Sequence, residues 1–307
     1  MRIVVLGAGG VGGYYGGLLA RAGHDVTLVA RGAHLAALRT RGLHVESVHG
    51  DFEVSPVSAT DDVTALEPAD LVLVTVKSYD LERVVDAARG LVGDNTAVLP
   101  LLNGLDTAER VAALVGERPV LAGLTHISSS IAAPGVIRHV SPLRRITFGE
   151  RHGRQTERAQ KIRDILAGAG IEAVLTDAVE PALWTKFLFI ASIGGVCCLA
   201  RQPIGPVLAT DETRALYVEA LREVEAVARA RGMALAANVV EQALGLTEGF
   251  PADTRPSMLV DLEAGRRLEL EAMSGTVVRY AREVGVDTPV HRVIYGALKP
   301  SVGNSPS

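Results

Sequence analysis

The sequence has few cysteines, and its histidines are not clustered, which argues against a disulfide-rich or a metal-binding protein. It has two cysteines, Cys197 and Cys198, and they are adjacent in an apolar stretch. Neighbouring cysteines do not easily bridge each other, so we expect two buried, inert thiols and no disulfide framework. The eight histidines are scattered without the spacing of metal ligands, and we predict no metal site.

The chain also has little excess charge of either sign. Its 31 lysines and arginines face 35 aspartates and glutamates, the formal net charge is −4, and the charges are interspersed. No basic patch favours a nucleic acid partner. The longest apolar run, residues 187–200, is too short and contains too much glycine for a membrane span, and the N-terminus lacks a signal peptide pattern. We therefore expect a cytoplasmic protein that binds neither nucleic acid nor membrane.

What the sequence does contain is a change of pattern about halfway along its 307 residues. The first part alternates apolar runs typical of strands with amphipathic runs typical of helices. Near-continuous apolar runs such as 71–76 suit a parallel sheet that is covered on both faces. The expected strands are residues 2–6, 25–30, 43–48, 52–57, 71–76 and 97–101, and the expected helices are 11–22, 34–41, 81–91 and 108–115.

Residues 119–149 are β-rich and could extend this sheet with antiparallel strands, before a helix over 156–169 and a strand over 171–175. After residue 176 the pattern is helical, and we expect a disordered tail over 300–307. The expected helices are residues 179–199, 212–231, 235–246, 257–263, 267–284 and 289–298. The sequence thus predicts an α/β fold with two domains: a Rossmann-type doubly wound sheet over 1–176 and an all-helical C-terminal domain over 177–307.

A glycine-rich turn follows the first predicted strand and leads directly into a helix. Its sequence is Gly7-Ala8-Gly9-Gly10-Val11-Gly12. In a dinucleotide-binding turn the first glycine permits the tight bend, the second lets the backbone approach a pyrophosphate, and the third lets the helix pack closely on the sheet. The phosphates lie at the helix N-terminus, where N–H groups and the helix dipole favour anions. All six residues are therefore candidate cofactor contacts.

Arg31 follows the second predicted strand, where an NAD site usually carries an acid for the ribose hydroxyls. A planar guanidinium can bind a 2′-phosphate through two parallel hydrogen bonds. We therefore predict NADP(H) as the cofactor rather than NAD(H). The alternative is a solvated arginine in a loop.

Two further polar residues follow strands of the predicted parallel sheet. Lys77 comes after the run 71–76, and Asn103 comes after the run 97–101. Because ligands bind beyond the carboxyl ends of such strands, both residues could touch cofactor or substrate. Each also has a simpler interpretation, since a lysine is often solvated and Asn-Gly is a preferred turn dipeptide.

Lys186 lies in residues 182–191, which are apolar around nearly the whole circumference of a helix. A lysine there destabilises the fold unless it is paired or faces a cavity. Partial desolvation lowers the pKa of the lysine and helps it to release a proton. The alternative is a side chain that extends to the surface. By pattern alone, Glu269 is an exposed charge on the helix 267–284, and Ser257 is part of a helix start.

Taken together, these residues resemble the ketopantoate reductase (2-dehydropantoate 2-reductase) family over nearly the whole chain. The resemblance implies NADP-dependent reduction of a 2-oxo acid to a 2-hydroxy acid, with ketopantoate as the leading substrate and pantothenate biosynthesis as the pathway. It rests on glycines 7–12, Arg31, Lys77, Asn103-Gly104, Trp184-Thr185-Lys186, and the spacing of Ser257, Glu269 and Gly275.

The resemblance also implies a role for each candidate residue. Lys186 polarises the keto oxygen and supplies its proton, and Glu269 orients Lys186 and helps to bind the substrate. Asn103 contacts the nicotinamide ribose or the substrate. Ser257 binds the substrate carboxylate, and Lys77 lines the cofactor side of the site. A positioned ammonium suits this reaction, because negative charge develops on the carbonyl oxygen.

The chain departs from the family at two positions that face the substrate. The family usually has asparagine four and eight residues after the catalytic lysine, where this chain has Ile190 and Gly194. A less polar keto substrate is therefore an alternative to ketopantoate. A non-catalytic NADP(H)-binding module is a second alternative, and the presence of both Lys186 and Glu269 disfavours it. Helices of the C-terminal domain could also form a homodimer.

Overall fold

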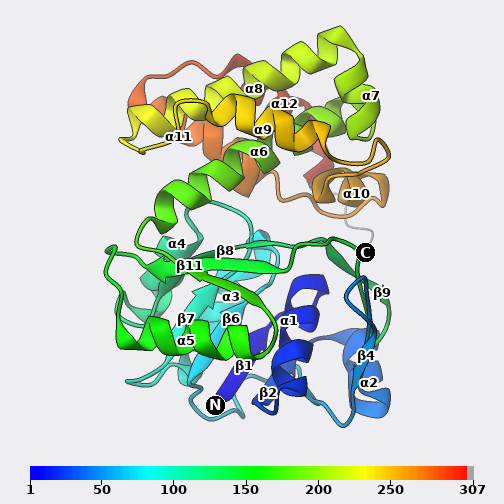
Figure 1. Cartoon of the computed structure of the whole chain (residues 1–307), viewed down its shortest axis with the longest axis vertical. Coiled ribbons are helices and arrows are strands. Elements are labelled where there is room, and N and C mark those ends of the chain that lie inside the picture. The colour runs from blue at the N-terminus through cyan, green and yellow to red at the C-terminus, as the bar shows by residue number, and fades with distance from the viewer. Residues whose placement is uncertain (303–307) are drawn as a thin grey trace. The chain divides into compact units, whose positions relative to one another are not determined.

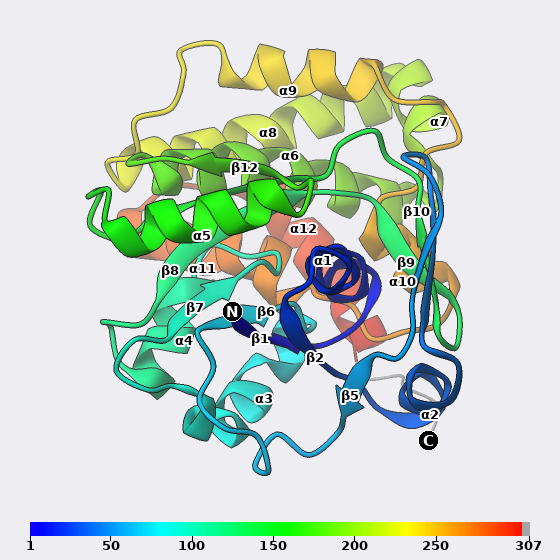
Figure 2. The ribbon, with the colours of Figure 1, turned by 60° about the horizontal axis from the view of Figure 1, so that its bottom comes forward.

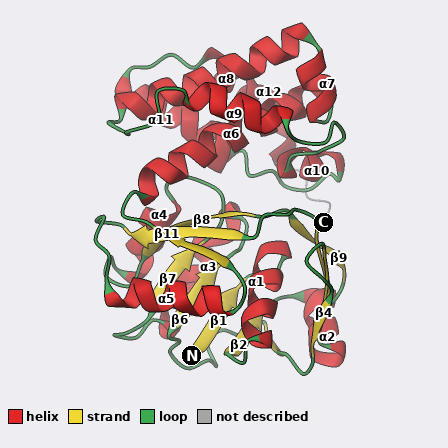
Figure 3. Ribbon diagram, in the orientation of Figure 1, coloured by secondary structure: helices red, strands yellow, loops and turns green. Residues whose placement is uncertain are grey.

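The computed structural model describes residues 1–302, and these form two compact units (Figure 1). The first unit comprises Met1–Leu102 and Asp106–Val179. The second comprises Asn103–Leu105 and the residues from Glu180 onward. All strands of the described chain lie in the first unit, and the second is helical (Figure 3). The prediction of a Rossmann-type sheet followed by a helical C-terminal part is confirmed.

A five-stranded parallel sheet forms the centre of the first unit, in the order β5-β2-β1-β6-β7. Its strands are β1 (Arg2–Leu6), β2 (Asp25–Val29), β5 (Ser58–Thr60), β6 (Leu71–Val74) and β7 (Ala97–Pro100). Leu6 pairs with Val29 on one side and with Val74 on the other. The carboxyl ends of β1, β2 and β6 therefore lie at one edge of the sheet.

The β-rich region after residue 119 does not simply extend this sheet. One further sheet has the order β4-β3-β10-β9, and another has the order β12-β11-β8. An isolated parallel bridge between Val98 and Val120 joins the last of these to β7. The strands are β3 (Leu43–Ser47), β4 (Phe52–Val54), β8 (Leu121–His126), β9 (Ser129–Ala133), β10 (Val136–His139), β11 (Arg145–Glu150) and β12 (Glu172–Leu175).

Helix α1 (Gly10–Arg21) packs between two of these sheets, and Figure 2 shows it nearly end-on beside β9 and β10. Its glycines permit this contact. A Cβ atom at Gly16 would lie 2.6 Å from Leu28 of β2, and one at Gly13 would lie 2.7 Å from Ile137 of β10. The other helices of the unit are α2 (Gly32–Arg41), α3 (Leu81–Ala87), α4 (Thr107–Val115) and α5 (Glu157–Gly168), with short 3₁₀ turns η1 (Ser78–Asp80) and η2 (Arg89–Leu91).

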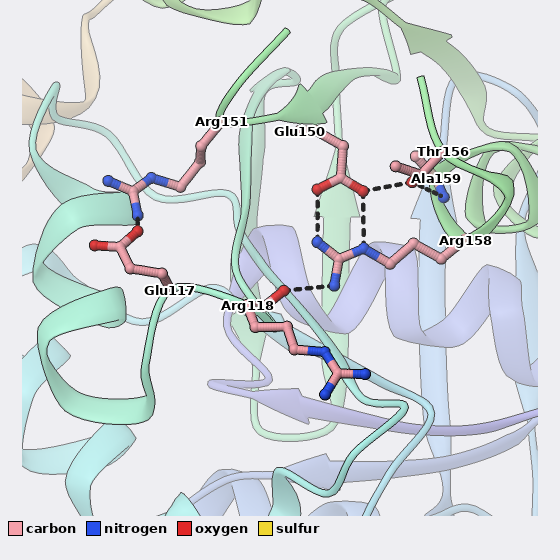
Figure 4. A network of polar contacts seen from close by, with 7 residues as sticks. All are labelled: Glu117, Arg118, Glu150, Arg151, Thr156, Arg158 and Ala159. Atoms are coloured by element: carbon pink, nitrogen blue, oxygen red, sulfur yellow. Dashed lines mark hydrogen bonds and ion pairs between the residues drawn. The ribbon is translucent and has the colours of Figure 1, made fainter. Parts of the chain in front are cut away.

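An ion pair with a buried carboxylate ties the start of α5 to the end of β11 (Figure 4). Arg158 donates two hydrogen bonds to the carboxylate of Glu150, and its Nη1 also donates to the backbone oxygen of Arg118. Thr156 donates to Glu150 and, as the N-cap of α5, accepts from the backbone N–H of Ala159 at 3.3 Å. One carboxylate thus holds both the guanidinium and the residue that caps the helix.

The second unit is built around α6 (Val179–Ala200), a helix of 22 residues that contributes more buried residues to its apolar core than any other helix of the unit. The sequence predicts that the apolar run 187–200 is too short for a membrane span, whereas α6 as a whole is long and apolar enough by length and composition, with a mean hydropathy of 1.8. Within that window 61% of the residues are buried inside the protein. Its length and composition therefore also suit the core helix of a globular unit.

Shorter helices surround α6. They are α7 (Ile204–Ala209), α8 (Asp211–Ala230), α9 (Val239–Glu248), α10 (Ser257–Glu263), α11 (Thr276–Val284) and α12 (Pro289–Leu298). The last described segment is a 3₁₀ turn, η4 (Lys299–Val302), where we expected disorder from residue 300. Residues 303–307 of that predicted tail lie outside the described part of the chain. Cys197 and Cys198 are buried thiols, and burial raises the pKa of each to about 12.

Candidate functional site

The backbone of the glycine turn requires glycine at two of its positions. Gly7 has φ +99°, which favours glycine, and a Cβ at Gly12 would lie 2.2 Å from the Gly7 carbonyl oxygen. A Cβ at Gly9, by contrast, would meet no atom of the described chain within 4 Å. Helix α1 begins at Gly10, and the first N–H groups of a helix have no partner within it. The turn is therefore tight on its inner side and open where an anion would approach.

Arg31 lies at the same edge, immediately before α2, with 63% of its side chain exposed. Its guanidinium donates a hydrogen bond to Asp80 at 3.2 Å, and Asp80 also pairs with Arg83. Burial acts to raise the pKa of Asp80, but the two arginines outweigh it and lower the pKa below its ordinary value. A guanidinium has five N–H donors, so the bond to Asp80 does not exhaust its capacity for a phosphate.

Lys77 follows β6 and precedes η1, and its side chain is half-buried. Because β1, β2 and β6 end in register, the turn after β1, Arg31 after β2 and Lys77 after β6 share one edge. The structure thus brings together the cofactor candidates that follow these three strands.

Lys186 and Asn103 meet in the second unit, although 83 residues separate them. The ammonium group of Lys186 donates a hydrogen bond to Oδ1 of Asn103 at 2.8 Å. Asn103 comes from the short segment after β7, and Lys186 from the second turn of α6. The simpler interpretations, a turn-forming asparagine and a lysine that extends to the surface, do not account for this contact.

Burial lowers the pKa of Lys186 to about 8, and the negative charge of Glu269 acts in the opposite direction. Removing the ammonium from water destabilises its charged form, while a nearby carboxylate stabilises it. A lysine with a pKa near neutral pH is suited to general acid catalysis, because it is protonated and yet gives up its proton readily.

Glu269 is buried, with 8% of its surface exposed, where the sequence pattern predicted an exposed charge. The predicted single helix over 267–284 is also wrong. A π-helical turn, η3 (Glu271–Gly275), precedes α11, and Glu269 lies before that turn. Such turns shift side chains out of the ordinary helical register and occur often at functional sites. Residues 266–269 are not helical, so the side-chain spacing of a continuous helix from residue 267 does not apply to Glu269.

A cavity of about 120 Å³ lies beside Asn103, the hydrogen-bond partner of Lys186. Asn103, Ile190, Gly194 and Ser257, four of the predicted substrate residues, line it. Ile190 and Gly194 lie one and two turns after Lys186 on the same face of α6. Lys186 and Glu269 do not line the cavity themselves, and Lys186 reaches its edge through Asn103.

Sequence reasoning missed most of the remaining cavity wall. Phe189 could have been predicted from the sequence, because it is adjacent to Ile190 in an apolar helix. Phe250 lies between α9 and α10, and its sequence neighbours give no signal of a site. The other missed lining residues are Ile193, Ile204, Thr254, Pro256, Met258 and Met273. Within residues 1–302, no three His, Cys, Asp or Glu side chains gather as a metal site would need.

Two family models match the sequence. One, described as ketopantoate reductase PanE/ApbA, matches residues 3–153, and the other, described as its C-terminal part, matches residues 178–301. Among curated relatives, the uncharacterized oxidoreductase YkpB of Bacillus subtilis is 30% identical over 97% of this chain and 98% of its own length. The 2-dehydropantoate 2-reductase of Halobacterium salinarum is 33% identical over 96% of both chains.

Solved structures agree with these matches. The 2-dehydropantoate 2-reductase of Geobacter metallireducens is 33% identical and superposes with a TM-score of 0.93 over 98% of this chain and 100% of its own. A D-mandelate dehydrogenase solved with NADH and anilino(oxo)acetate has a TM-score of 0.90 over 98% of both chains. It is 19% identical, so this second likeness concerns the fold alone.

Proposed function

Because the chain belongs to the ketopantoate reductase family of oxidoreductases, we propose that it reduces a 2-oxo acid to the corresponding 2-hydroxy acid with NADPH. One observation supports this proposal above the others. Lys186 has a pKa of about 8 and is held by Asn103 beside a mostly apolar cavity. A proton donor at such a place is what reduction of a carbonyl requires.

When bound, NADPH supplies a hydride to the carbonyl carbon of the substrate. The ammonium of Lys186 stabilises the negative charge that grows on the carbonyl oxygen and then transfers its proton to that oxygen. The neutral amine regains a proton from solvent. Asn103 accepts a hydrogen bond from the ammonium and so fixes its direction.

The remaining site residues take supporting roles in this proposal. Glu269 favours the charged form of Lys186 and helps to orient it. Ser257, the first residue of α10, binds the substrate carboxylate from the cavity wall. Ile190 and Gly194 line the space for the substrate side chain. In functional terms, residues 177–307 form the substrate and catalytic domain, to which Asn103 is added from the first half of the chain.

The cofactor residues form the other part of the proposal, in the domain of residues 1–176. The turn Gly7-Ala8-Gly9-Gly10-Val11-Gly12 holds the pyrophosphate at the start of α1. Arg31 binds the 2′-phosphate that distinguishes NADPH from NADH. Lys77 adds a positive charge at the same edge of the sheet, and Asn103 is proposed to contact the nicotinamide ribose or the substrate.

The first substrate to test is 2-dehydropantoate, whose product is pantoate, an intermediate of pantothenate biosynthesis. Its support is the name that many curated relatives share at about 30% identity. We further propose a cytoplasmic enzyme that could form a homodimer and that needs no metal, nucleic acid or membrane.

The decisive test follows NADPH oxidation by the purified protein with a panel of 2-oxo acids. Lys186→Ala is expected to leave NADPH binding largely intact and to abolish turnover. Turnover close to that of the wild type in this variant would refute the assigned role. Binding of NADPH without turnover of any 2-oxo acid would instead favour a non-catalytic binding module.

The choice of cofactor has its own test. Arg31→Ala is expected to weaken NADPH binding far more than NADH binding, because it removes a contact that only NADPH makes. Arg39→Ala is a matched control, since Arg39 lies in α2, the helix that follows Arg31, and likewise pairs with an aspartate, Asp61. Equal losses for both cofactors in Arg31→Ala would rule out the 2′-phosphate contact.

A further inference from the structure

The cavity beside Asn103 is mostly hydrocarbon. Eight of its twelve lining residues carry apolar side chains, and three carry polar ones. Phe189 and Phe250, both among the lining residues, stack with ring centroids 5.9 Å apart and an angle of 11° between their planes. Ile190 and Met258 continue the apolar wall.

Three polar side chains line the cavity, the same number as the oxygen atoms of a 2-oxo carboxylate. Such a substrate has three oxygens, one on the keto group and two on the carboxylate. Lys186 with Asn103 serves the keto oxygen, and the hydroxyls of Ser257 and Thr254 are the two other polar groups of the lining. A fourth oxygen, on the substrate side chain, would lie against apolar wall. An unpaired buried hydroxyl is unfavourable, because it loses its hydrogen bonds to water.

The cavity volume fits a compact hydrocarbon group. It measures about 120 Å³, while a dry apolar cavity of about 150 Å³ holds benzene. A tertiary butyl group is smaller than benzene, and a phenyl group is close to it in size. Either one would pack against the apolar part of the cavity wall without needing a hydrogen bond.

We infer that the preferred substrate is a 2-oxo acid whose side chain is a compact branched or aromatic hydrocarbon group without a hydroxyl. This inference rests on the proposed function, since it names the substrate class of the same reduction. In it, Ile190 and Gly194 select the substrate side chain, and the stacked pair Phe189 and Phe250 packs against it. 2-Dehydropantoate, which carries a hydroxyl on a group of suitable shape, is then a poorer substrate.

A matched pair of substrates tests the inference. 2-Dehydropantoate is 4-hydroxy-3,3-dimethyl-2-oxobutanoate, and 3,3-dimethyl-2-oxobutanoate differs from it only in lacking the hydroxyl. We expect kcat/KM for NADPH-dependent reduction to be higher by about tenfold or more for the compound without the hydroxyl. Oxo(phenyl)acetate should also be reduced faster than 2-dehydropantoate.

An equal or higher kcat/KM for 2-dehydropantoate would overturn the inference and leave the proposed reductase function intact. Failure of every 2-oxo acid to oxidise NADPH would overturn the proposed function and the inference with it.

Variants of the cavity wall test which residues determine the preference for a substrate without the hydroxyl. Ile190→Asn introduces a hydrogen-bonding side chain and should reduce or reverse the ratio of the two kcat/KM values. Ile190→Val keeps the wall apolar and should retain the ratio. An unchanged ratio in a folded Ile190→Asn protein would contradict the assignment of this wall.

A second pair guards against misfolding of Ile190→Asn. A Cβ at Gly194 would lie 3.7 Å from Cε of Met258, which is an ordinary contact, so serine and alanine both fit there. Gly194→Ser adds a hydroxyl to the cavity and should favour 2-dehydropantoate relative to Gly194→Ala. Identical ratios in the two variants would count against the inference.

Discussion

The ammonium of Lys186 donates a hydrogen bond to the side-chain oxygen of Asn103 at 2.8 Å. The two residues come from segments with different local patterns, a loop after a strand and an apolar helix. The contact gives the lysine a fixed direction beside the cavity that Asn103 lines. It also makes Asn103 a partner of the proposed proton donor.

Replacing Asn103 should therefore impair the chemical step. Asn103→Leu removes the hydrogen-bond acceptor and leaves the ammonium without this fixed direction. We expect kcat to fall by about 10²-fold, the size of effect that a small misplacement of a catalytic group produces. Single-turnover measurements with saturating NADPH separate this effect from weaker cofactor binding. A kcat within about twofold of the wild-type value would show that the contact does not position Lys186.

The pH dependence of reduction should report the pKa of Lys186. Because the ammonium is the acid, the reaction needs its protonated form, which predominates below pH 8 and is lost as the pH rises. We expect kcat/KM for the 2-oxo acid to fall about tenfold per pH unit above that value. A pH-independent kcat/KM through this range would contradict the role of Lys186 as acid.

Glu269→Gln should shift the fall of kcat/KM at alkaline pH to lower pH. Burial lowers the pKa of Lys186, and the charge of Glu269 opposes that effect, so its removal lets the pKa fall further. Glu271→Gln is the control, because it removes the same charge two residues away, where Glu271 bonds to Tyr295 and Lys299. If the pH at which kcat/KM falls shifts equally in both variants, the shift is a general effect of charge and not specific to Glu269.

Gly9→Ala should separate cofactor binding from folding. The added methyl meets no atom of the described chain within 4 Å, and the backbone at Gly9 is extended, so stability should be unchanged. The methyl would occupy the space from which a pyrophosphate approaches, and the dissociation constant for NADPH should rise about tenfold or more.

Gly90→Ala serves as the control for Gly9→Ala. Its added methyl also meets no atom of the described chain within 4 Å, but Gly90 lies in η2, away from the glycine turn in sequence. Unaltered NADPH binding by Gly9→Ala would argue that the pyrophosphate does not lie against this turn.

The ion pair between Glu150 and Arg158 should stabilise the first unit. Glu150→Gln replaces an oxygen that accepts from Arg158 with an amide donor, and we expect a loss of about 1.5–3 kcal/mol in the free energy of unfolding. Glu117→Gln, which alters the exposed pair with Arg151, should cost less than about 1 kcal/mol. Urea denaturation of both variants measures the difference.

The effect of Glu150 should also depend on pH. Burial acts to raise its pKa, but the hydrogen bonds from Arg158 and Thr156 outweigh burial and lower the pKa below its ordinary value. A carboxyl with a lowered pKa stabilises the fold above its unfolded pKa, and this stabilisation is lost as the pH falls through the folded value. The difference between wild type and Glu150→Gln should therefore shrink in acid. A constant difference would exclude this linkage.

The parts of the fold that were predictable have strong local signals. The apolar strands, the glycine turn and the helical C-terminal part each follow from consecutive residues. Pairings between distant strands do not, and β3 pairs in parallel with β10, about 90 residues later, in a sheet that the pattern did not predict. No short window of sequence specifies such a partner.

The candidate site divides in the same way. Lys186 was predictable because a charge inside an apolar helix conflicts with its surroundings. The burial of Glu269 was not, because residues 266–269 are not helical and the expected helical spacing does not apply to them. Phe250 reaches the cavity from a loop, and tertiary packing alone gives it that position.

The membership of Asn103–Leu105 in the second unit has a consequence for protein engineering. A chimera made by one crossover near residue 180 would take Lys186 from one parent and Asn103 from the other. A fragment that begins at Glu180 would lack the acceptor for the lysine altogether. Domain exchange between homologues therefore needs three junctions, so that Asn103–Leu105 and the residues from Glu180 onward come from the same parent.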